Sequence, residues 1–262
     1  MINEWDLTQT NQSRLKDNLP KVIVIPTGAV EPHNLHLPLG QDFLHTSWIA
    51  DQACKQAWEK CKKVACLPAI PYGVDCNLLD FPLAVHISQN TLNAVIEDII
   101  VSMETYGIKK FVILNGHGGN DFTPFVRQIQ CDMDVHVFVC NWWTVAMDKY
   151  NEIFDKPDDH AGEFETSVAL ALFPEQVEYE KAGKAIPRPF RFEALNKGWV
   201  KTSRRFSRLN PFCAAGDPAN ATAEKGRKIL EIVVERLSRF LVELAEEEID
   251  EMFPQEKSLN SF

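Results

Sequence analysis

Strand-like and helical runs alternate along the first half of the chain, and this order limits the folds that the chain can adopt. Residues 21–29 (KVIVIPTGA) form a short β-branched run closed by proline and glycine, which is typical of a buried strand. Residues 41–62 then carry apolar side chains at helical spacing. Further strands are expected at 64–70, 111–114 and 135–140, and further helices at 91–106 and 121–130. This alternation predicts an α/β fold in which helices cover both faces of a mainly parallel sheet.

The second half of the chain adds two expected helices and no sign of a second domain. One helix is expected at 163–173. A longer C-terminal helix has one apolar stripe, formed by Ile229, Val233, Leu237, Phe240 and Leu244. This helix can begin after Asp217, with Pro218 in the first helical position, or after Thr222. We therefore expect a single domain over 1–262, with a core at about 21–245 and a polar, frayed tail at 251–262.

The composition excludes several classes of protein. The 262 residues include 27 Lys and Arg against 37 Asp and Glu, and the net charge of −10 argues against a general nucleic-acid binder. Seven scattered cysteines without a Cys-x-x-Cys pair fit reduced thiols better than a disulfide framework. No run approaches about 20 apolar residues, and the N-terminus lacks the pattern of a signal peptide. We expect a soluble, cytoplasmic protein without a membrane partner.

The segment 31–42 (EPHNLHLPLGQD), directly after the first expected strand, is rich in carboxylates and imidazoles. Glu31 and His33 are two residues apart, so in extended backbone their side chains project to the same side. Asp42 comes at the start of a helical run, where a carboxylate is favoured, and each of its oxygens can bind a metal. This combination of ligands suits zinc, manganese or iron, with His36 in a supporting role. The segment predicts a metal site at the end of the strand.

Two further patches have the same chemistry. Residues 115–120 (NGHGGN) follow an expected strand, and residues 160–167 (HAGEFETS) combine one histidine with two glutamates. Alone, the former could be a tight turn and the glutamates could be ordinary first-turn helix charges. In an open α/β sheet, however, ligands bind where strands end and helices begin, so the first two patches are expected to converge. Three such patches on one chain indicate a metal-dependent hydrolase.

Charge balance favours two metal ions over one. Glu31, Asp42 and Glu165 would bring three negative charges together, which is costly without a cation. Two divalent ions supply four positive charges, and a bridging hydroxide would neutralise the remaining one. Such a hydroxide is the nucleophile of metal hydrolases, because metal binding lowers the pKa of water toward about 7.

Taken in order, the patches EPHNLHLP, Asp42, NGHGGN and HAGEFETS resemble the motifs of the creatininase (creatinine amidohydrolase) family, from about residue 21 to 245. The segment GDP at 216–218, followed by Ala221 and Thr222, is similar to a later motif of that family. The resemblance implies a three-layer α/β/α sandwich. It also implies a dinuclear site that hydrolyses a non-peptide C–N bond in a cyclic amide or formamide, and a homo-oligomer, commonly a hexamer.

The resemblance assigns roles to the first two patches. Glu31 and His117 would bind one divalent ion, His33 would bind the other, and Asp42 would bridge them. The small-molecule substrate would contact the residues that follow His117, namely Gly118, Gly119 and Asn120.

The third patch would complete the site. Creatininases proper have their fifth ligand, a glutamate, at the position of Gly119. Family members with glycine there are expected to use a carboxylate of the third patch, so we assign Glu165, with Glu163 as the alternative. His160 would then carry a proton to the leaving nitrogen, oriented by Glu163 or Asp159.

Several departures from the family pattern concern the substrate. Asn34 replaces a family glycine, and Asn tolerates left-handed backbone nearly as well. Residues 73–84 (GVDCNLLDFPLA) lack the Ser, the His and the Gly-Thr of the family stretch Gly-x-Ser-x-x-His-x-x-Phe-Pro-Gly-Thr. Lys156 stands where creatininases carry a tryptophan that closes over the substrate ring. The chain is therefore not expected to be a creatininase proper.

A basic segment gives one clue to the substrate. Residues 181–208 contain a single acid, Glu193, against nine basic residues: Lys181, Lys184, Arg188, Arg191, Lys197, Lys201, Arg204, Arg205 and Arg208. The segment is either a solvated loop or subunit interface, or a rim that binds an anionic substrate.

Two other functions are compatible with parts of the sequence. A creatininase scaffold without turnover would be a metal- or ligand-binding protein, and a turnover screen with an Asp42→Ala control separates it from an enzyme. Residues 116–119 could instead bind a nucleotide phosphate, but they lack both a Lys-Ser/Thr end and a Gly-x-Gly-x-x-Gly pattern.

Overall fold

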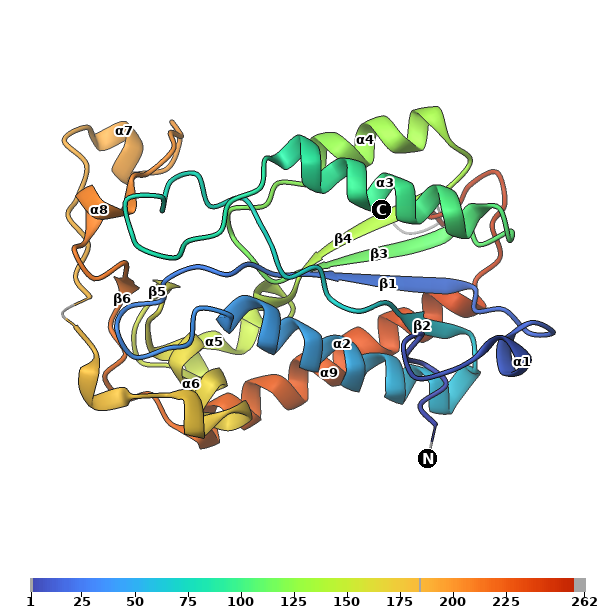
Figure 1. Cartoon of the computed structure of the whole chain (residues 1–262), viewed down its shortest axis with the longest axis horizontal. Coiled ribbons are helices and arrows are strands. Elements are labelled where there is room, and N and C mark those ends of the chain that lie inside the picture. Colours follow the sequence, from blue (N-terminus) through green and yellow to red (C-terminus); the bar gives the residue numbers. More distant parts are fainter. Residues whose placement is uncertain (1, 184, 257–262) are drawn as a thin grey trace.

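The computed structural model describes residues 2–183 and 185–256 and has a four-stranded parallel sheet at its centre (Figure 1). Its strands are β1 (Val22–Thr27), β2 (Val64–Cys66), β3 (Lys110–Asn115) and β4 (His136–Asn141), in the order β2-β1-β3-β4. β2 ends earlier than the expected 64–70. Beyond it, the backbone N–H of Leu67 donates to Val24 of β1, and an isolated bridge pairs Ile70 with Thr27. The predicted α/β class with a mainly parallel sheet is confirmed.

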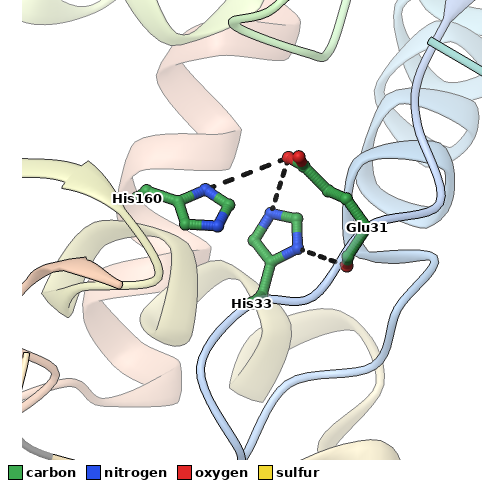
Figure 2. Close-up of side chains that lie close together, drawn as sticks. All are labelled: Glu31, His33 and His160. Atoms are coloured by element: carbon green, nitrogen blue, oxygen red, sulfur yellow. Dashed lines mark hydrogen bonds and ion pairs between the residues drawn. The ribbon is translucent and has the colours of Figure 1, made fainter. Parts of the chain in front are cut away.

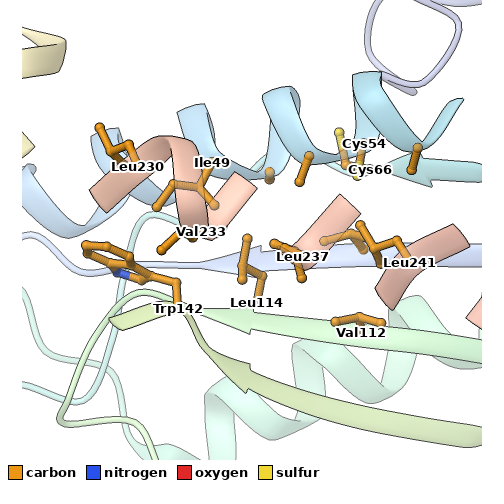
Figure 3. Packing of buried hydrophobic residues seen from close by; sticks show 14 of the residues in the cluster. Ile49, Cys54, Cys66, Val112, Leu114, Trp142, Leu230, Val233, Leu237 and Leu241 are labelled. Atoms are coloured by element: carbon orange, nitrogen blue, oxygen red, sulfur yellow. The ribbon is translucent and has the colours of Figure 1, made fainter. Parts of the chain in front are cut away.

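Helices cover both faces of the sheet (Figure 1). On one face lie α2 (Gln41–Cys61) and α9 (Ala223–Glu246), and on the other lie α3 (Gln89–Glu104) and α4 (Thr123–Asp132). Successive residues of β1 alternate between the two layers: Val22 and Val24 pack with α2 and α9, whereas Ile23 and Ile25 pack with α3 and α4. Figure 3 shows the first layer, in which Leu114 of β3 lies near Ile49 of α2 and Leu237 of α9. A strand buried on both faces needs an uninterrupted apolar run, which is why 21–29 has one. The result is a single-domain three-layer α/β/α sandwich.

The C-terminal helix α9 begins at Thr222 rather than at Asp217. The Thr222 hydroxyl accepts a hydrogen bond from the backbone N–H of Lys225, as an N-cap residue does. The expected apolar stripe packs on the sheet side: four of its five residues are buried, and Phe240 is partly buried. Gly226 lets α9 approach α6 (Glu163–Leu172) closely, because a Cβ there would lie 2.0 Å from the carbonyl oxygen of Ser167.

A smaller antiparallel sheet lies beyond the carboxyl ends of the main strands. It pairs β5 (Asp158–His160) with β6 (Ala215–Gly216). The remaining short α-helices are α1 (Gln12–Leu15), α5 (Tyr150–Ile153), α7 (Glu193–Asn196) and α8 (Phe206–Leu209). Short 3₁₀ helices occupy Trp142–Thr144, Met147–Lys149, Pro174–Gln176 and Tyr179–Lys181. Residues 158–160 were not expected to form a strand, since they have no apolar pattern.

The described part of the tail is docked, in contrast to the frayed tail that its polarity predicted. The Phe253 ring packs edge-on against Phe138 of β4, with ring centroids 6.3 Å apart, and against His136 at 4.7 Å. Phe253 thus connects this polar segment to the sheet edge, while 257–262 lie outside the described residues. Among the described helices, none is both long and apolar enough to cross a membrane.

Candidate metal centre

The topology brings the first two patches together. Glu31 and His33 lie on the loop after β1, and His117 lies directly after the neighbouring strand β3. Parallel neighbours end at the same edge of a sheet, so the side chains that follow them meet there. Asp42 reaches the same point from the first turn of α2. These four side chains are at most 4% exposed.

Asp42 lies between the two imidazoles. Its Oδ1 is 3.1 Å from Nε2 of His33, and its Oδ2 is 2.9 Å from Nδ1 of His117. The same nitrogen of His117 is 3.1 Å from Oε1 of Glu31. One carboxylate therefore offers a different oxygen to each side of the cluster, as a bridging ligand requires.

The backbone fixes the ring of His33. Its Nδ1 lies 3.1 Å from the carbonyl oxygen of Glu31, to which it can only donate (Figure 2). Nε2 then faces the carboxylates, 3.7 Å from Oε1 of Glu31 and 3.9 Å from Oε2 of Glu165. Oε2 of Glu31 is buried and has no hydrogen-bond partner among the described residues. A buried ligand atom without a hydrogen-bond partner fits metal coordination.

Two groups of three side chains have ligand atoms close enough for one metal ion each. Glu31, Asp42 and His117 form one, and His33, Asp42 and Glu165 form the other, with all ligand atoms of a group within 4.8 Å of one another. The groups share Asp42. Glu31, His33 and His160 form a further group by the same distance.

Burial and neighbouring charges shift the pKa values of the side chains in the cluster. Burial raises the pKa of Glu31 to about 7 and that of Glu165 to about 8. Burial opposes protonation of His33, but Asp42, Glu165 and Glu31 together raise its pKa to about 10. Carboxylates and imidazoles thus hold protons in this cluster, at a place where divalent cations would neutralise the same charge.

His160 faces the cluster from the end of β5 (Figure 2). Its Nε2 donates to the carbonyl oxygen of Pro32 at 2.9 Å, which leaves the Nδ1 lone pair 3.9 Å from Oε1 of Glu31. Burial, with a smaller effect of His33, lowers the pKa of His160 to about 3. The imidazole is therefore neutral and presents an acceptor to the site.

The expected orienting role of Glu163 or Asp159 is not what the structure shows. The carboxylate of Glu163 is fully buried and accepts hydrogen bonds from the backbone N–H groups of Asp155 and Lys156 and from Nζ of Lys225. Glu163 points away from His160 because it closes the loop before β5.

Asp159 is exposed and pairs with Arg204. A backbone carbonyl, that of Pro32, therefore orients His160 in place of either acid.

Comparison with known proteins assigns the chain to one family. The family model described as creatininase, creatinine amidohydrolase, matches residues 6–241. The chain belongs to the creatininase family. It is thereby a hydrolase of the class that acts on carbon–nitrogen bonds.

Relatives of the chain differ in their named activities. A Bacteroides fragilis crystal structure, provisionally assigned as a creatinine amidohydrolase, has a TM-score of 0.87 at 34% identity and covers 96% of this chain and 100% of that one. The mycofactocin precursor peptide peptidase of Mycobacterium tuberculosis is 28% identical over 88% of each chain. The creatinine amidohydrolase of Pseudomonas putida is 26% identical over 83% of this chain and 87% of its own. Since one relative is named a peptidase, a non-peptide bond is not a fixed property of the family.

This creatininase-family chain has Gly119 at the position where creatininases proper have a glutamate. A Cβ at Gly119 would lie 2.3 Å from Nε2 of His117 and 2.4 Å from the carbonyl oxygen of Val74. The local backbone therefore has no room for a side chain, and Glu165 approaches the cluster from α6 instead. Asn34, which replaces a family glycine, has a φ of 56° and so adopts the left-handed backbone that was expected there.

The expected substrate-contacting residues divide into two sets. Gly118 and Gly119 line the cavity next to the cluster. Asn120 does not: it is buried, its Oδ1 accepts from the backbone N–H of Val74, and its amide donates to Asn115. Its role is to hold the loop 73–75 against β3.

The sequence patterns did not identify two residues that contribute to the site. Asp158 accepts from the backbone N–H groups of Gly162, Phe164 and Glu165, so it caps α6 and positions the third patch. Asp75 is fully buried, with Oδ1 3.0 Å from Nε2 of His117. Its only sequence signal was its place in the segment 73–84, two residues after Gly73, where the family pattern has serine.

A cavity of about 610 Å³ opens onto the cluster. Its wall is aromatic, with Trp142, Trp143, Tyr150, Phe164 and Phe206. Among the described basic residues of the segment 181–208, Arg204 alone lines it; Lys184 lies outside the described residues. The guanidinium of Arg204 pairs with Asp159 and lies 5.3 Å from the centre of the Phe206 ring.

Proposed function

We propose that this chain is a two-metal amidohydrolase that cleaves a C–N bond of a small-molecule cyclic amide or formamide. The observation that carries the proposal is the pair of ligand groups that share Asp42. A single carboxylate with one oxygen toward each group suits two ions held side by side, and the donor set of carboxylates and imidazoles suits zinc, manganese or iron.

The distances support a division of the ligands between the two proposed ions. Glu31 and His117 would hold one ion, His33 and Glu165 the other, and Asp42 both. When bound, two divalent ions would polarise the scissile carbonyl and supply an activated water at neutral pH.

His160 is the group that we assign to proton transfer. It is neutral, its Nε2 proton is held by Pro32, and its Nδ1 lone pair points into the cluster. Such a nitrogen can take a proton from the attacking water and return it to the leaving nitrogen. The bond to a rigid backbone carbonyl keeps the ring in this orientation through both steps.

The substrate is proposed to be larger than creatinine. A cavity of about 610 Å³ is in the range that buries drug-sized ligands. Lys156 replaces the closing tryptophan, and its ammonium group pairs with Asp217. An anionic substrate would have to displace Asp159 from Arg204 or Asp217 from Lys156, so the paired cations support the anion-binding rim less than the basic composition suggested.

A turnover screen tests the proposal. The full-length chain, loaded with zinc, manganese or iron, is incubated with creatinine, other cyclic amides, neutral and phosphorylated formamides and short peptides, and the released amine or formate is measured. We expect metal-dependent turnover of an amide, and none by Asp42→Ala. If the protein binds two ions and turns over no member of the panel, the alternative of a metal-binding scaffold without catalysis is favoured.

The family resemblance also supports a proposal about assembly. We expect a homo-oligomer, a hexamer by resemblance, and light scattering on the eluting protein measures its mass directly.

A further inference from the structure

We propose that Asp75 is a positioning residue that holds His117 with its Nδ1 atom toward the proposed ion and thereby strengthens the binding of one of the two ions. This inference rests on the proposed two-metal function. Asp75 stands in the segment 73–84, where this chain departs from the family pattern.

The two nitrogens of His117 face opposite ways. Nδ1 is directed at Asp42 and Glu31, at 2.9 and 3.1 Å. Nε2 lies 3.0 Å from Oδ1 of Asp75 and 3.3 Å from the carbonyl oxygen of Val74, so acceptors alone surround it. A neutral imidazole carries one proton, and a proton held at Nε2 leaves the Nδ1 lone pair for a ligand. A carboxylate behind a metal-binding imidazole has this effect in general and makes the imidazole a better donor.

Asp75 is buried and has few polar partners besides His117. The residue is 0% exposed, and no Lys or Arg pairs with it among the described residues. Its Oδ1 meets His117 as a close ion-pair contact, and neither of its oxygens makes a hydrogen bond among the described residues. Its backbone N–H donates to Nδ1 of His86, which fixes the loop and hence the direction of the side chain. A buried carboxylate with so few partners is costly unless positive charge lies nearby.

Only the imidazole ring of His117 separates the negative charge of Asp75 from the proposed ion. Asp75 on one side of His117, and Asp42 with Glu31 on the other, form a line of carboxylate, imidazole and carboxylates that a divalent cation would neutralise. Serine, the family residue at this position, would place a polar oxygen beside His117 but would supply no charge. We therefore infer that this chain binds the ion on His117 more tightly than an Asp75→Ser variant would.

Metal titration of variants tests the inference. The metal-stripped full-length chain is titrated calorimetrically with zinc and with manganese, comparing wild type with Asp75→Asn, which keeps shape and acceptor but loses charge, and with Asp75→Ser. We expect one of the two sites to weaken about 10- to 100-fold in both variants while the other is unchanged. Cobalt loading gives a second readout, since the visible spectrum of only one of two ions should change. Asp80→Asn, an exposed acid of the same segment, is the matched control and should titrate as wild type.

The outcomes separate this inference from the function on which it rests. If wild type binds no divalent ion, the two-metal proposal fails. If wild type binds two ions and Asp75→Asn binds both with unchanged affinity and cobalt spectrum, only the role of Asp75 is overturned. A merely structural role would lower the melting temperature of the metal-free variant and weaken both sites alike, and that result would also overturn it.

Discussion

Oδ1 of Asp42 lies 3.1 Å from Nε2 of His33, and this short distance joins the start of α2 to the loop after β1. The other oxygen of the same carboxylate lies 2.9 Å from Nδ1 of His117. Asp42 is therefore the residue whose loss should affect both proposed ions, whereas loss of Glu165 or His117 should affect one.

The first prediction concerns Asp42→Asn. We expect the bound metal to fall from two ions to fewer than one per chain and turnover to fall at least about 10³-fold, because both ions lose a charged ligand. Elemental analysis of the dialysed protein measures the stoichiometry. Glu165→Gln should retain about one ion, and equal losses in the two variants would contradict a bridging role for Asp42.

The second prediction is that metal binding releases protons. In the metal-free protein the pKa of His33 is raised to about 10, that of His117 lies well above its usual value, and burial raises that of Glu165 to about 8. Below these values a proton occupies each ligand atom, so raising the pH favours the ion. From His33 alone, its site should bind about tenfold more tightly per pH unit between pH 6 and 8, and the site of His117 should also tighten as the pH rises.

Calorimetry in buffers of different ionisation enthalpy measures the protons released. We expect more protons per ion at pH 6 than at pH 8, since the glutamates are deprotonated by then in part. An affinity that does not change with pH would show that the cluster holds no protons to displace.

The sequence predicted the parts of the site that depend on local pattern. Glu31 and His33 share a side because extended backbone has a period of two, and they meet His117 because parallel strands end at one edge. The α/β class followed from the same alternation of strands and helices, and Thr222 was one of the two caps that the residue types allowed for α9.

The remaining parts depend on contacts between distant segments that leave no mark in composition. The partner of His160 is a backbone carbonyl, and any residue at 32 would present one. Asp75 lies in a loop without periodicity, and its position is set by Asn120 and His86 across the fold. Glu163 resembled a site residue because it lies between His160 and Glu165 in sequence, but helical geometry turns it toward Lys225 and away from Glu165.

The third prediction uses two adjacent glycines. In Gly119→Ala the new Cβ would meet His117 and Val74 at 2.3 and 2.4 Å, so the ring must move. We expect metal affinity at one site to fall 10- to 100-fold, with a loss of stability of about 1–3 kcal/mol. Gly118→Ala is the matched control, because nothing lies within 4 Å of its Cβ. Similar metal titrations for the two variants would refute the steric explanation of Gly119.

The fourth prediction concerns the corrected role of Glu163. Glu163→Gln removes a fully buried charge from the ammonium group of Lys225 and weakens two backbone hydrogen bonds. We expect the free energy of unfolding to fall by about 2–4 kcal/mol. Metal content should stay at two ions per chain, because Glu163 touches no ligand atom. Loss of an ion with unchanged denaturant midpoint would instead make Glu163 a ligand, which was the alternative to Glu165.

The fifth prediction separates proton transfer from metal binding at His160. His160→Gln keeps a side-chain amide that can reach Pro32 but removes the basic Nδ1 atom. If His160 carries protons, kcat should fall about 10²- to 10⁴-fold while two ions remain bound and KM changes little. His160 also belongs to a group of possible ligands with Glu31 and His33, so the metal content of this variant is decisive. Retention of both ions with reduced kcat assigns the ring to the chemistry, whereas loss of one ion assigns it to the metal, because a residue that transfers protons must keep its lone pair free.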